Sequence, residues 1–298
     1  ISYSYEVFCW GDNSYGQLGA GDNINRRFPF KLFIDNSDSI RFRKLKTFAD
    51  HTCALSFEGD LYCWGRNDSG QLGIGDNTNR NIIQKVNFPA SNSHTLVMDF
   101  AVGSNHTCLI NNKNRVFCWG DNTYGQLGLG AGSDLNEIGL ASVSFSAFAN
   151  QNVYEIDAGD SFTCAKTGNG YLYCWGRNDF GQLGIGNLVD QATPQETSSA
   201  AYKFDLGEKH GCLIDTSWQA KCWGDNSLGQ FGDGTNTDSD TPTDIYTITP
   251  GSEAFLEVKL GHNHTCFQGD LFTPYNDEIN CTGLGTSGQI GNGSTATI

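Results

Sequence analysis

A fifteen-residue segment that recurs along the chain constrains its fold more than any other feature. The first copy, VFCWGDNSYGQLGAG, spans residues 7–21, and four close copies and one degraded copy follow. The tryptophans of the first five copies are spaced 54, 55, 56 and 48 residues apart. A period near 50, with strand-like apolar residues and many glycines, is typical of a β-propeller with one blade per repeat.

A second, shorter signal lies upstream of five copies and reads ADHTCAL, SNHTCLI, DSFTCAK, EKHGCLI and HNHTCFQ. Alternating apolar residues before it predict an inner strand, followed by a short turn and a second strand that carries the cysteine. The CWG segment is then the third strand, and GQLG leads into the fourth. The sequence therefore predicts an all-β propeller of six or seven four-stranded blades.

The motif W-G-x-N-x-x-G-Q-L-G, with G-x-x-H-T upstream, resembles the regulator-of-chromosome-condensation repeat. The resemblance covers essentially the whole chain and implies a β-propeller, commonly of seven blades. The cysteine-bearing form, HTC followed by CWG, resembles the secreted members of this family. The plant ultraviolet-B photoreceptors share the fold, but we expect only a poor resemblance to them because no tryptophan occurs in the x-x-H-T-C segments.

We expect a single domain over residues 1–298, built from six units. The unit boundaries fall at roughly 1–43, 44–97, 98–152, 153–201, 202–256 and 257–298. The chain holds six third-plus-fourth-strand segments but five HTC arms, so we expect the first blade to be incomplete. The first residue is Ile1 with no signal-like segment, and we expect a processed or partial chain.

Ten of the eleven cysteines form pairs with regular spacing, four of them ten residues apart and one fifteen apart. The pairs are Cys53 with Cys63, Cys108 with Cys118, Cys164 with Cys174, Cys212 with Cys222, and Cys266 with Cys281. A ten-residue separation places two cysteines opposite each other on a hairpin whose turn needs positive φ six residues after the first cysteine. Gly59, Asn114 and Gly170 stand there, so we predict one hairpin disulfide per full blade.

Two consequences follow from this cysteine pattern. Zinc ligation by these pairs, or by His262, His264 and Cys266, is less favoured because zinc motifs space their cysteines two to four residues apart. Cys9 has no mate, so we expect it to be unpaired or intermolecular. Many disulfides indicate an oxidising compartment, and we expect a secreted or cell-surface protein.

The charge balance excludes some partners. The net charge is −15, which repels nucleic acid and anionic membrane surfaces. No apolar run is long enough for membrane insertion. We find no phosphate loop, nucleophile elbow or paired carboxylates fixed by the repeat, and so we expect no cofactor, no metal and no enzymatic activity.

Several side chains are candidates for binding. Loop positions after the third strands hold Tyr15, Tyr124, Phe180 and Leu228, which could contact a partner or pack under a neighbouring loop. Trp218 stands where a hairpin turn prefers glycine, and its indole could contact a partner or lie back on the blade. Phe48 takes a place near the axis that glycine holds in the other units. The histidines before the cysteines are expected to pack between blades, because Phe162 replaces one of them.

The chain has five Asn-x-Ser/Thr sequons, which are candidate glycosylation sites. They are Asn67, Asn105, Asn263, Asn280 and Asn292. Asn67 and Asn292 are expected to be the most accessible, because the other three adjoin predicted strands.

These observations favour a secreted, non-enzymatic scaffold that binds protein partners or associates with itself, including polymers formed through the incomplete blade. Binding or inhibition of a secreted enzyme through one propeller face is the alternative. Guanine-nucleotide exchange, which the family resemblance implies, is less favoured because disulfides belong to a different compartment. A small-molecule ligand is not specified by the sequence.

Overall fold

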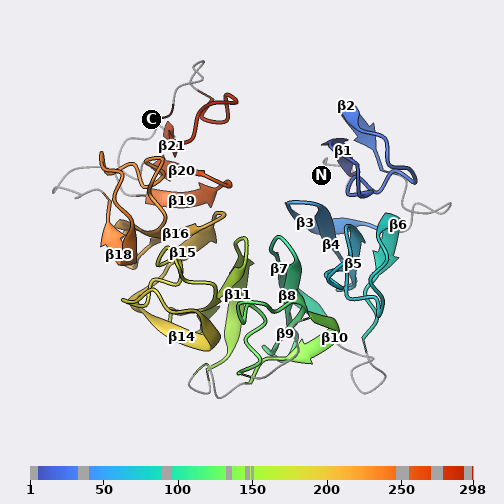
Figure 1. Cartoon of the computed structure of the whole chain (residues 1–298), viewed down its shortest axis with the longest axis horizontal. Coiled ribbons are helices and arrows are strands. Elements are labelled where there is room, and N and C mark those ends of the chain that lie inside the picture. The colour runs from blue at the N-terminus through green and yellow to red at the C-terminus, as the bar shows by residue number, and fades with distance from the viewer. Residues whose placement is uncertain are drawn as a thin grey trace.

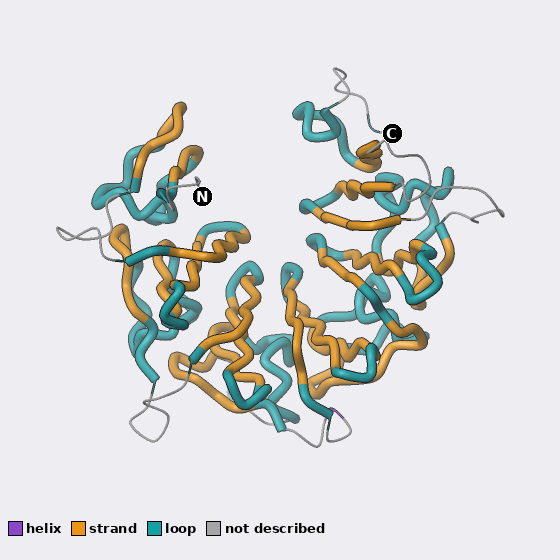
Figure 2. The backbone as a smooth tube through the Cα atoms, turned by 180° about the vertical axis from the view of Figure 1, so that it is seen from behind, coloured by secondary structure: helices purple, strands orange, loops and turns teal. Residues whose placement is uncertain are grey.

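The chain folds into an open arc of β-sheets arranged around a central axis (Figure 1). The computed structural model describes residues 6–32, 40–88, 96–131, 136–144, 148, 151–245, 255–269, 278–291 and 297. Five sheets are blades whose first strands lie nearest the axis, and a sixth sheet has two strands. The view from behind shows the same arc, with the two chain ends on either side of its opening (Figure 2).

The strands of each blade pair antiparallel in chain order, so every blade is built from consecutive hairpins. Blade 1 consists of β3 (Phe42–Phe48), β4 (His51–Ser56), β5 (Leu61–Gly65) and β6 (Arg80–Lys85). Blade 2 consists of β7 (Val97–Val102), β8 (His106–Asn111), β9 (Val116–Asp121) and β10 (Asn136–Ser142). Blade 3 consists of β11 (Val153–Ala158), β12 (Phe162–Thr167), β13 (Tyr171–Gly176) and β14 (Gln191–Ala200).

Blade 4 has the same strand order as these blades, whereas the sheets at the two ends of the arc have fewer described strands. Blade 4 is complete, with β15 (Lys203–Leu206), β16 (His210–Ile214), β17 (Ala220–Gly224) and β18 (Ser239–Asp244). In blade 5 the described residues form three strands, which are β19 (Phe255–Leu260), β20 (His264–Gly269) and β21 (Glu278–Gly283). The remaining sheet, which we call the N-terminal ribbon, pairs β1 (Phe8–Gly11) with β2 (Arg26–Lys31).

The expected number of six or seven blades is wrong, because the described residues form five. Copies of the third-strand motif overestimate the number of blades, because a blade also needs an HTC arm. The first copy contributes only β1 and β2, which correspond to third and fourth strands. Within the described ranges, no strand pairs with the other edge of β1.

The cysteine hairpins form as the spacing predicts, with one disulfide in each of the five blades. In each pair the two Cα atoms lie 4.1–4.2 Å apart across an antiparallel ladder. The bonds join Cys53 to Cys63, Cys108 to Cys118, Cys164 to Cys174, Cys212 to Cys222, and Cys266 to Cys281. The fifteen-residue separation of the last pair therefore gives the same cross-strand geometry as the ten-residue separation of the others.

The hairpin turns also have the expected backbone conformation. The position six residues after the first cysteine has a φ of 87° at Gly59, 56° at Asn114 and 88° at Gly170. Trp218 occupies the same position in blade 4 at φ 64°, a conformation that costs a β-carbon-bearing residue about 1 kcal/mol.

The hydrophobic core lies between neighbouring blades. One buried cluster, for example, joins Leu55, Leu61 and Leu72 of blade 1 to Phe100 and Trp119 of blade 2. Gly73 shows how close this packing is, because a Cβ added there would lie 2.5 Å from Trp119 Nε1. The last glycine of GQLG is therefore required by the tryptophan of the following blade as well as by its own φ of 66°.

Candidate functional site

A polar contact that we call the inter-blade clamp holds neighbouring units together. Trp119 Nε1 and Thr107 Oγ1 of blade 2 both donate hydrogen bonds to Gln71 O of blade 1, over 2.9 Å and 2.8 Å. The tryptophan and glutamine of the repeat therefore stabilise the contact between neighbouring blades. Thr282, which replaces the tryptophan in blade 5, still donates to the preceding unit through Gly229 O at 2.8 Å.

A buried histidine adds a second polar contact to the inter-blade clamp, and in this contact the earlier blade supplies the donor. His51 Nε2 lies 3.0 Å from Thr107 Oγ1, and since that hydroxyl gives its hydrogen to Gln71, we assign the proton of the imidazole to Nε2. Burial lowers the pKa of His51 to about 3, and that of His106 to about 4. These neutral histidines pack between blades, in agreement with the expectation from Phe162.

The predicted loop aromatics lie half-buried against a cation of the following unit. Arg66 lies 5.1 Å from the centre of the Tyr15 ring, and Arg177 lies 5.0 Å from that of Tyr124. Lys209 makes the same contact with Phe180 at 4.8 Å. These cation–π contacts connect the loops of successive units. They explain the aromatic residues at these positions without a partner protein. The position of Leu228 is likewise half-buried, and a binding role for the four residues stays a prediction.

Trp218 lies back on the molecule. Its ring centre is 4.7 Å from that of Tyr202, and it packs against the core of blade 4. The hairpin turn keeps the positive φ of the other blades, so the indole contact offsets part of the backbone cost.

The five sequons occupy different environments. Asn67 is fully buried, and its Nδ2 donates to Asp76 O at 2.7 Å, so the expectation that it is accessible is wrong. Asn105 and Asn263 are partly buried, whereas Asn280 is exposed on β21. Asn292 lies outside the described residues. Glycan attachment stays a prediction, and Asn280 is the most accessible of the four described positions.

The N-terminal ribbon presents an apolar strand edge. Trp10 is 59 % exposed, although its equivalents in blades 1 to 4 are fully buried. Phe8 is also exposed, and Cys9 between them is the one cysteine without a disulfide, all eleven lying within the described ranges. Burial raises the pKa of the Cys9 thiol, so the thiolate form is disfavoured at neutral pH.

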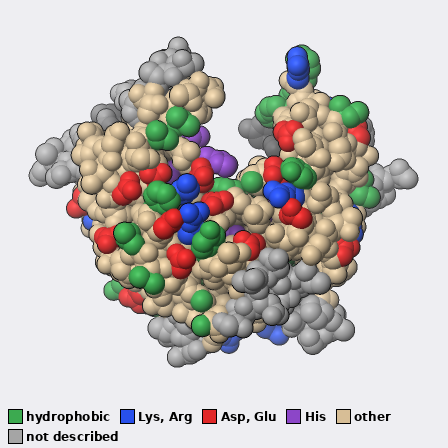
Figure 3. Space-filling model, viewed as in Figure 1, with side chains coloured by type: hydrophobic (Ala, Val, Ile, Leu, Met, Phe, Trp, Pro, Cys, Tyr) green, Lys and Arg blue, Asp and Glu red, His purple; other side chains and the backbone are tan. Residues whose placement is uncertain are grey.

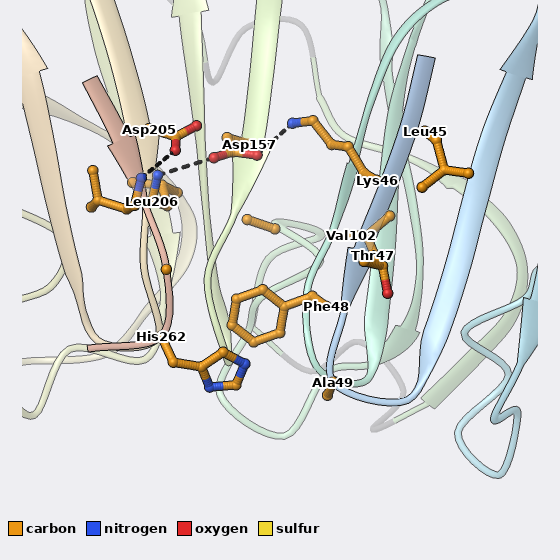
Figure 4. Close-up of a pocket in the computed structure, with 13 residues that line it drawn as sticks. Leu45, Lys46, Thr47, Phe48, Ala49, Val102, Asp157, Asp205, Leu206 and His262 are labelled. Carbon is orange, nitrogen blue, oxygen red and sulfur yellow. Dashed lines mark hydrogen bonds and ion pairs between the residues drawn. The ribbon is translucent and has the colours of Figure 1, made fainter. Parts of the chain in front are cut away.

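A second feature is the axial cavity, an open space of about 530 Å³ lined by the inner strands of all five blades and the turns that follow them. Its lining combines charged and apolar side chains, including Lys46, Phe48, Asp157, Asp205, Leu206 and His262. Figure 4 shows Lys46 reaching toward Asp157, while the Phe48 and His262 rings lie together at the turn ends of the strands. The two rings are stacked, with centres 4.7 Å apart and an interplanar angle of 19°.

The charges of the axial cavity are unevenly compensated. Lys46 Nζ donates to Asp157 Oδ1, and the nearby carboxylates outweigh burial to raise the pKa of Lys46, which stays charged. Asp205 Oδ2 accepts the Leu260 N–H at 2.7 Å. Burial, and then the charge of Asp157, raise the pKa of Asp205 to about 7. One carboxyl group of the cavity therefore changes protonation near neutral pH.

Sequence reasoning missed this cavity. Its charged residues lie two places before the axial glycine position, but the repeat does not fix their sign: that place holds Lys46, Ala101, Asp157, Asp205 and Lys259. The departure at Phe48 was the available signal, because it marks a side chain that points to the axis. Sequence reasoning also missed Leu188 and Val189, two aliphatic loop residues that are 59 % and 63 % exposed.

Side chains of both charge signs lie close together around the inner part of the face shown in Figure 3, next to a notch in which histidine is visible. Over the described part of the chain, no group of three or more His, Cys, Asp or Glu side chains is arranged to hold a metal ion. Within the same described residues, no helix has the length and hydrophobicity that a membrane span requires.

Comparison with protein families gives an extensive match. The model of the Regulator of chromosome condensation (RCC1) repeat matches residues 6–55, 58–110, 113–165, 169–214 and 222–268. A second RCC1 repeat model matches residues 97–126 and 153–182.

Two curated relatives cover about two thirds of the chain. The ultraviolet-B receptor UVR8 of Arabidopsis thaliana is 37 % identical over 194 residues, which are 65 % of this chain and 42 % of the receptor. The expectation of a poor resemblance to plant photoreceptors is therefore wrong. The probable E3 ubiquitin-protein ligase HERC6 of Homo sapiens is 30 % identical over 203 residues, or 65 % of this chain and 19 % of the ligase. The chain thus spans less than half the length of either relative.

Solved structures agree on the fold. Human WBSCR16 superimposes with a TM-score of 0.78 at 20 % identity, covering 90 % of this chain and 68 % of that one. Yeast RCC1 (Prp20), solved bound to Kap60, gives a TM-score of 0.79 at 20 % identity, with coverages of 94 % and 64 %. Identities this low show the fold alone. With five repeat matches over most of its length, the chain belongs to the RCC1 repeat family of β-propellers.

Proposed function

We propose that this protein is a secreted or cell-surface, non-enzymatic scaffold that binds proteins and associates with itself through the N-terminal ribbon. The five disulfides support this proposal, because such a set is stable in an oxidising compartment and rare in the cytosol. The net charge of −15 is unsuited to nucleic acid, so proteins are the favoured partners.

The free edge of β1 is the observation that carries the proposal. In blades 1 to 5 a third strand pairs with a second strand and joins it through a disulfide, as Cys53 joins Cys63. On β1 the corresponding backbone edge and Cys9 have no such neighbour among the described residues. An added antiparallel strand would supply both partners, which is the mode of β-strand addition. Trp10 lies on the face of β1 that a preceding unit covers in blades 1 to 4, as Gln71 of blade 1 does for Trp119, so a partner in that place would cover it as well.

Relatives give support at the level of class. Yeast RCC1 (Prp20) was solved with Kap60, and the structure of Prp20p from Saccharomyces cerevisiae was described with its binding to Gsp1p and histones. These partners belong to that protein, and they support protein binding as a use of the fold. We do not propose nucleotide exchange here, because five disulfides indicate a different compartment.

The test is the association state of the natively purified chain. We expect oligomers in size-exclusion chromatography with light scattering and a covalent dimer on non-reducing gels, because two antiparallel β1 strands would bring two copies of Cys9 together. Cys9→Ser should abolish the covalent dimer, and Trp10→Asp should weaken the non-covalent association. The matched control is Tyr171→Asp, an exposed aromatic on β13 of blade 3. A strictly monomeric wild type with a free Cys9 thiol would contradict self-association.

Binding of a secreted enzyme through one face is a second candidate, favoured by the exposed Leu188 and Val189. Leu188→Asp combined with Val189→Asp should remove such binding and leave self-association unchanged. Equal enzyme binding by this variant and the wild type would contradict the candidate.

A further inference from the structure

The axial cavity has a charged end and an aromatic end. Asp157, Asp205 and Lys46 lie along the inner strands at one end, and Phe48 and His262 lie at the turns at the other (Figure 4). The lining also includes the apolar side chains of Val102, Leu206 and Leu260. Its volume of about 530 Å³ falls in the range of small-ligand sites.

The two carboxylates of the cavity are not equivalent. Asp157 is ion-paired with Lys46 and accepts the Leu206 N–H at 3.0 Å. The nearest cation to Asp205 is Lys259 at 3.5 Å, but its side chain is 66 % exposed and also lies 3.4 Å from Glu257. The side chain of Asp205 is only 18 % exposed. The negative charge of its carboxylate therefore has little compensation from positive groups inside the cavity.

We propose that the axial cavity binds an alkylammonium or guanidinium group, with Asp205 as its ionic partner. The carbon chain of the ligand lies along Leu206 and Leu260, and the Phe48–His262 pair contacts it at the turn end. This goes beyond the scaffold function, because a free amine is a sufficient ligand and no partner protein is needed.

The charge balance favours a cation over an anion. An anion would have to compete with Asp157 for Lys46 and would lie beside two carboxyl groups, which is unfavourable at low dielectric. A cation meets the carboxyl group of Asp205 directly. Such a group can come from a free small amine or from a lysine or arginine side chain of a protein.

The proposal predicts a definite pH dependence. Asp205 faces Asp157 of β11, Lys46 of β3 and Lys259 of β19, and His262 follows β19. Since the pKa of Asp205 is raised to about 7, its carboxyl is largely neutral at pH 6 and ionised at pH 8. Cation affinity should therefore rise about tenfold from pH 6 to pH 8. The rise should be absent in Asp205→Asn, which has no carboxyl group to ionise.

The experiment is calorimetric titration of the full chain with n-butylammonium, n-butylguanidinium and the capped peptide Gly-Gly-Arg-Gly-Gly. We expect saturable 1:1 binding at pH 8, weakened at least tenfold by Asp205→Asn. Glu58→Gln, which removes one negative charge from an exposed turn, should bind like wild type. Tighter binding of the peptide indicates a protein side chain as the natural ligand, and tighter binding of the free monocations indicates a small amine.

A second measurement guards against misfolding of the variant. In the wild type, carboxyl-carbon NMR should show the pKa of Asp205 falling when n-butylguanidinium is added. The proposal is overturned if none of the three probes binds saturably, or if Asp205→Asn binds them as wild type does. An unchanged Asp205 titration at saturating ligand also overturns it.

Discussion

At the scale of single residues, one interface shows how the inter-blade contacts depend on each other. His106 Nε2 lies 2.8 Å from Thr163 Oγ1, and the same histidine–threonine pair recurs at two other interfaces. Between blades 3 and 4 both members are replaced, by Phe162 and Gly211. The phenyl ring of Phe162 cannot donate a hydrogen bond to a threonine hydroxyl. With glycine at position 211, no hydroxyl is left there without a donor. The pair therefore behaves as a unit.

This dependence predicts energetic coupling between His106 and Thr163. We expect His106→Phe alone to lower the free energy of unfolding by about 1–2 kcal/mol, because a buried hydrogen bond is lost. Combining it with Thr163→Gly should cost less than the sum of the single changes, by at least about 0.5 kcal/mol. Urea unfolding of all four species measures the coupling. Additivity within about 0.3 kcal/mol would refute it.

At the scale of elements, the cysteine hairpins were the most predictable part of the fold. Spacing alone gave the pairing and the positive φ at Gly59, Asn114 and Gly170, since both are local consequences of hairpin geometry. The number of blades is not determined by local sequence, because a copy of the motif does not show whether all four strands of its blade are present. The axial cavity was less predictable still, because Lys46 and Asp157 are 111 residues apart and meet only across the axis.

Removing one hairpin disulfide should destabilise the molecule measurably. We expect Cys108→Ala with Cys118→Ala to lower the free energy of unfolding by about 2–3 kcal/mol, because the unfolded chain loses a crosslink. Thermal unfolding without reductant measures the change. Cys9→Ala is the control and should cost far less, because Cys9 closes no loop. Equal losses in the two variants would show that packing, rather than the crosslink, sets the cost.

At the scale of the whole molecule, the buried histidines distribute acid sensitivity over several interfaces. Burial lowers the pKa of His51 and His210 to about 3 and that of His106 to about 4, against 6.5 when exposed. Below pH 6.5 the unfolded chain therefore binds protons that the folded chain does not, and each histidine lowers stability as the pH falls toward 4.

The expected loss between pH 7 and pH 5 is up to about 2 kcal/mol for each buried histidine. Urea unfolding at several pH values measures it, and His106→Phe should reduce the number of protons taken up on unfolding by close to one. Leu188→Ala, which changes an exposed apolar side chain and removes no titratable group, is the control and should leave that number nearly unchanged. The same proton uptake in His106→Phe as in wild type would rule out the buried, neutral state of His106.

The inter-blade clamp has a direction, since the earlier unit supplies a carbonyl and the later unit supplies the donors. Stability in such an array is a sum of nearest-neighbour terms, so loss of one blade weakens the next more than distant ones. In blade 5 a threonine, Thr282, replaces the clamp tryptophan, so the apolar part of this clamp is reduced. Unfolding is therefore expected to start at blade 5 and to advance blade by blade toward blade 1, so that it is sequential and has one direction.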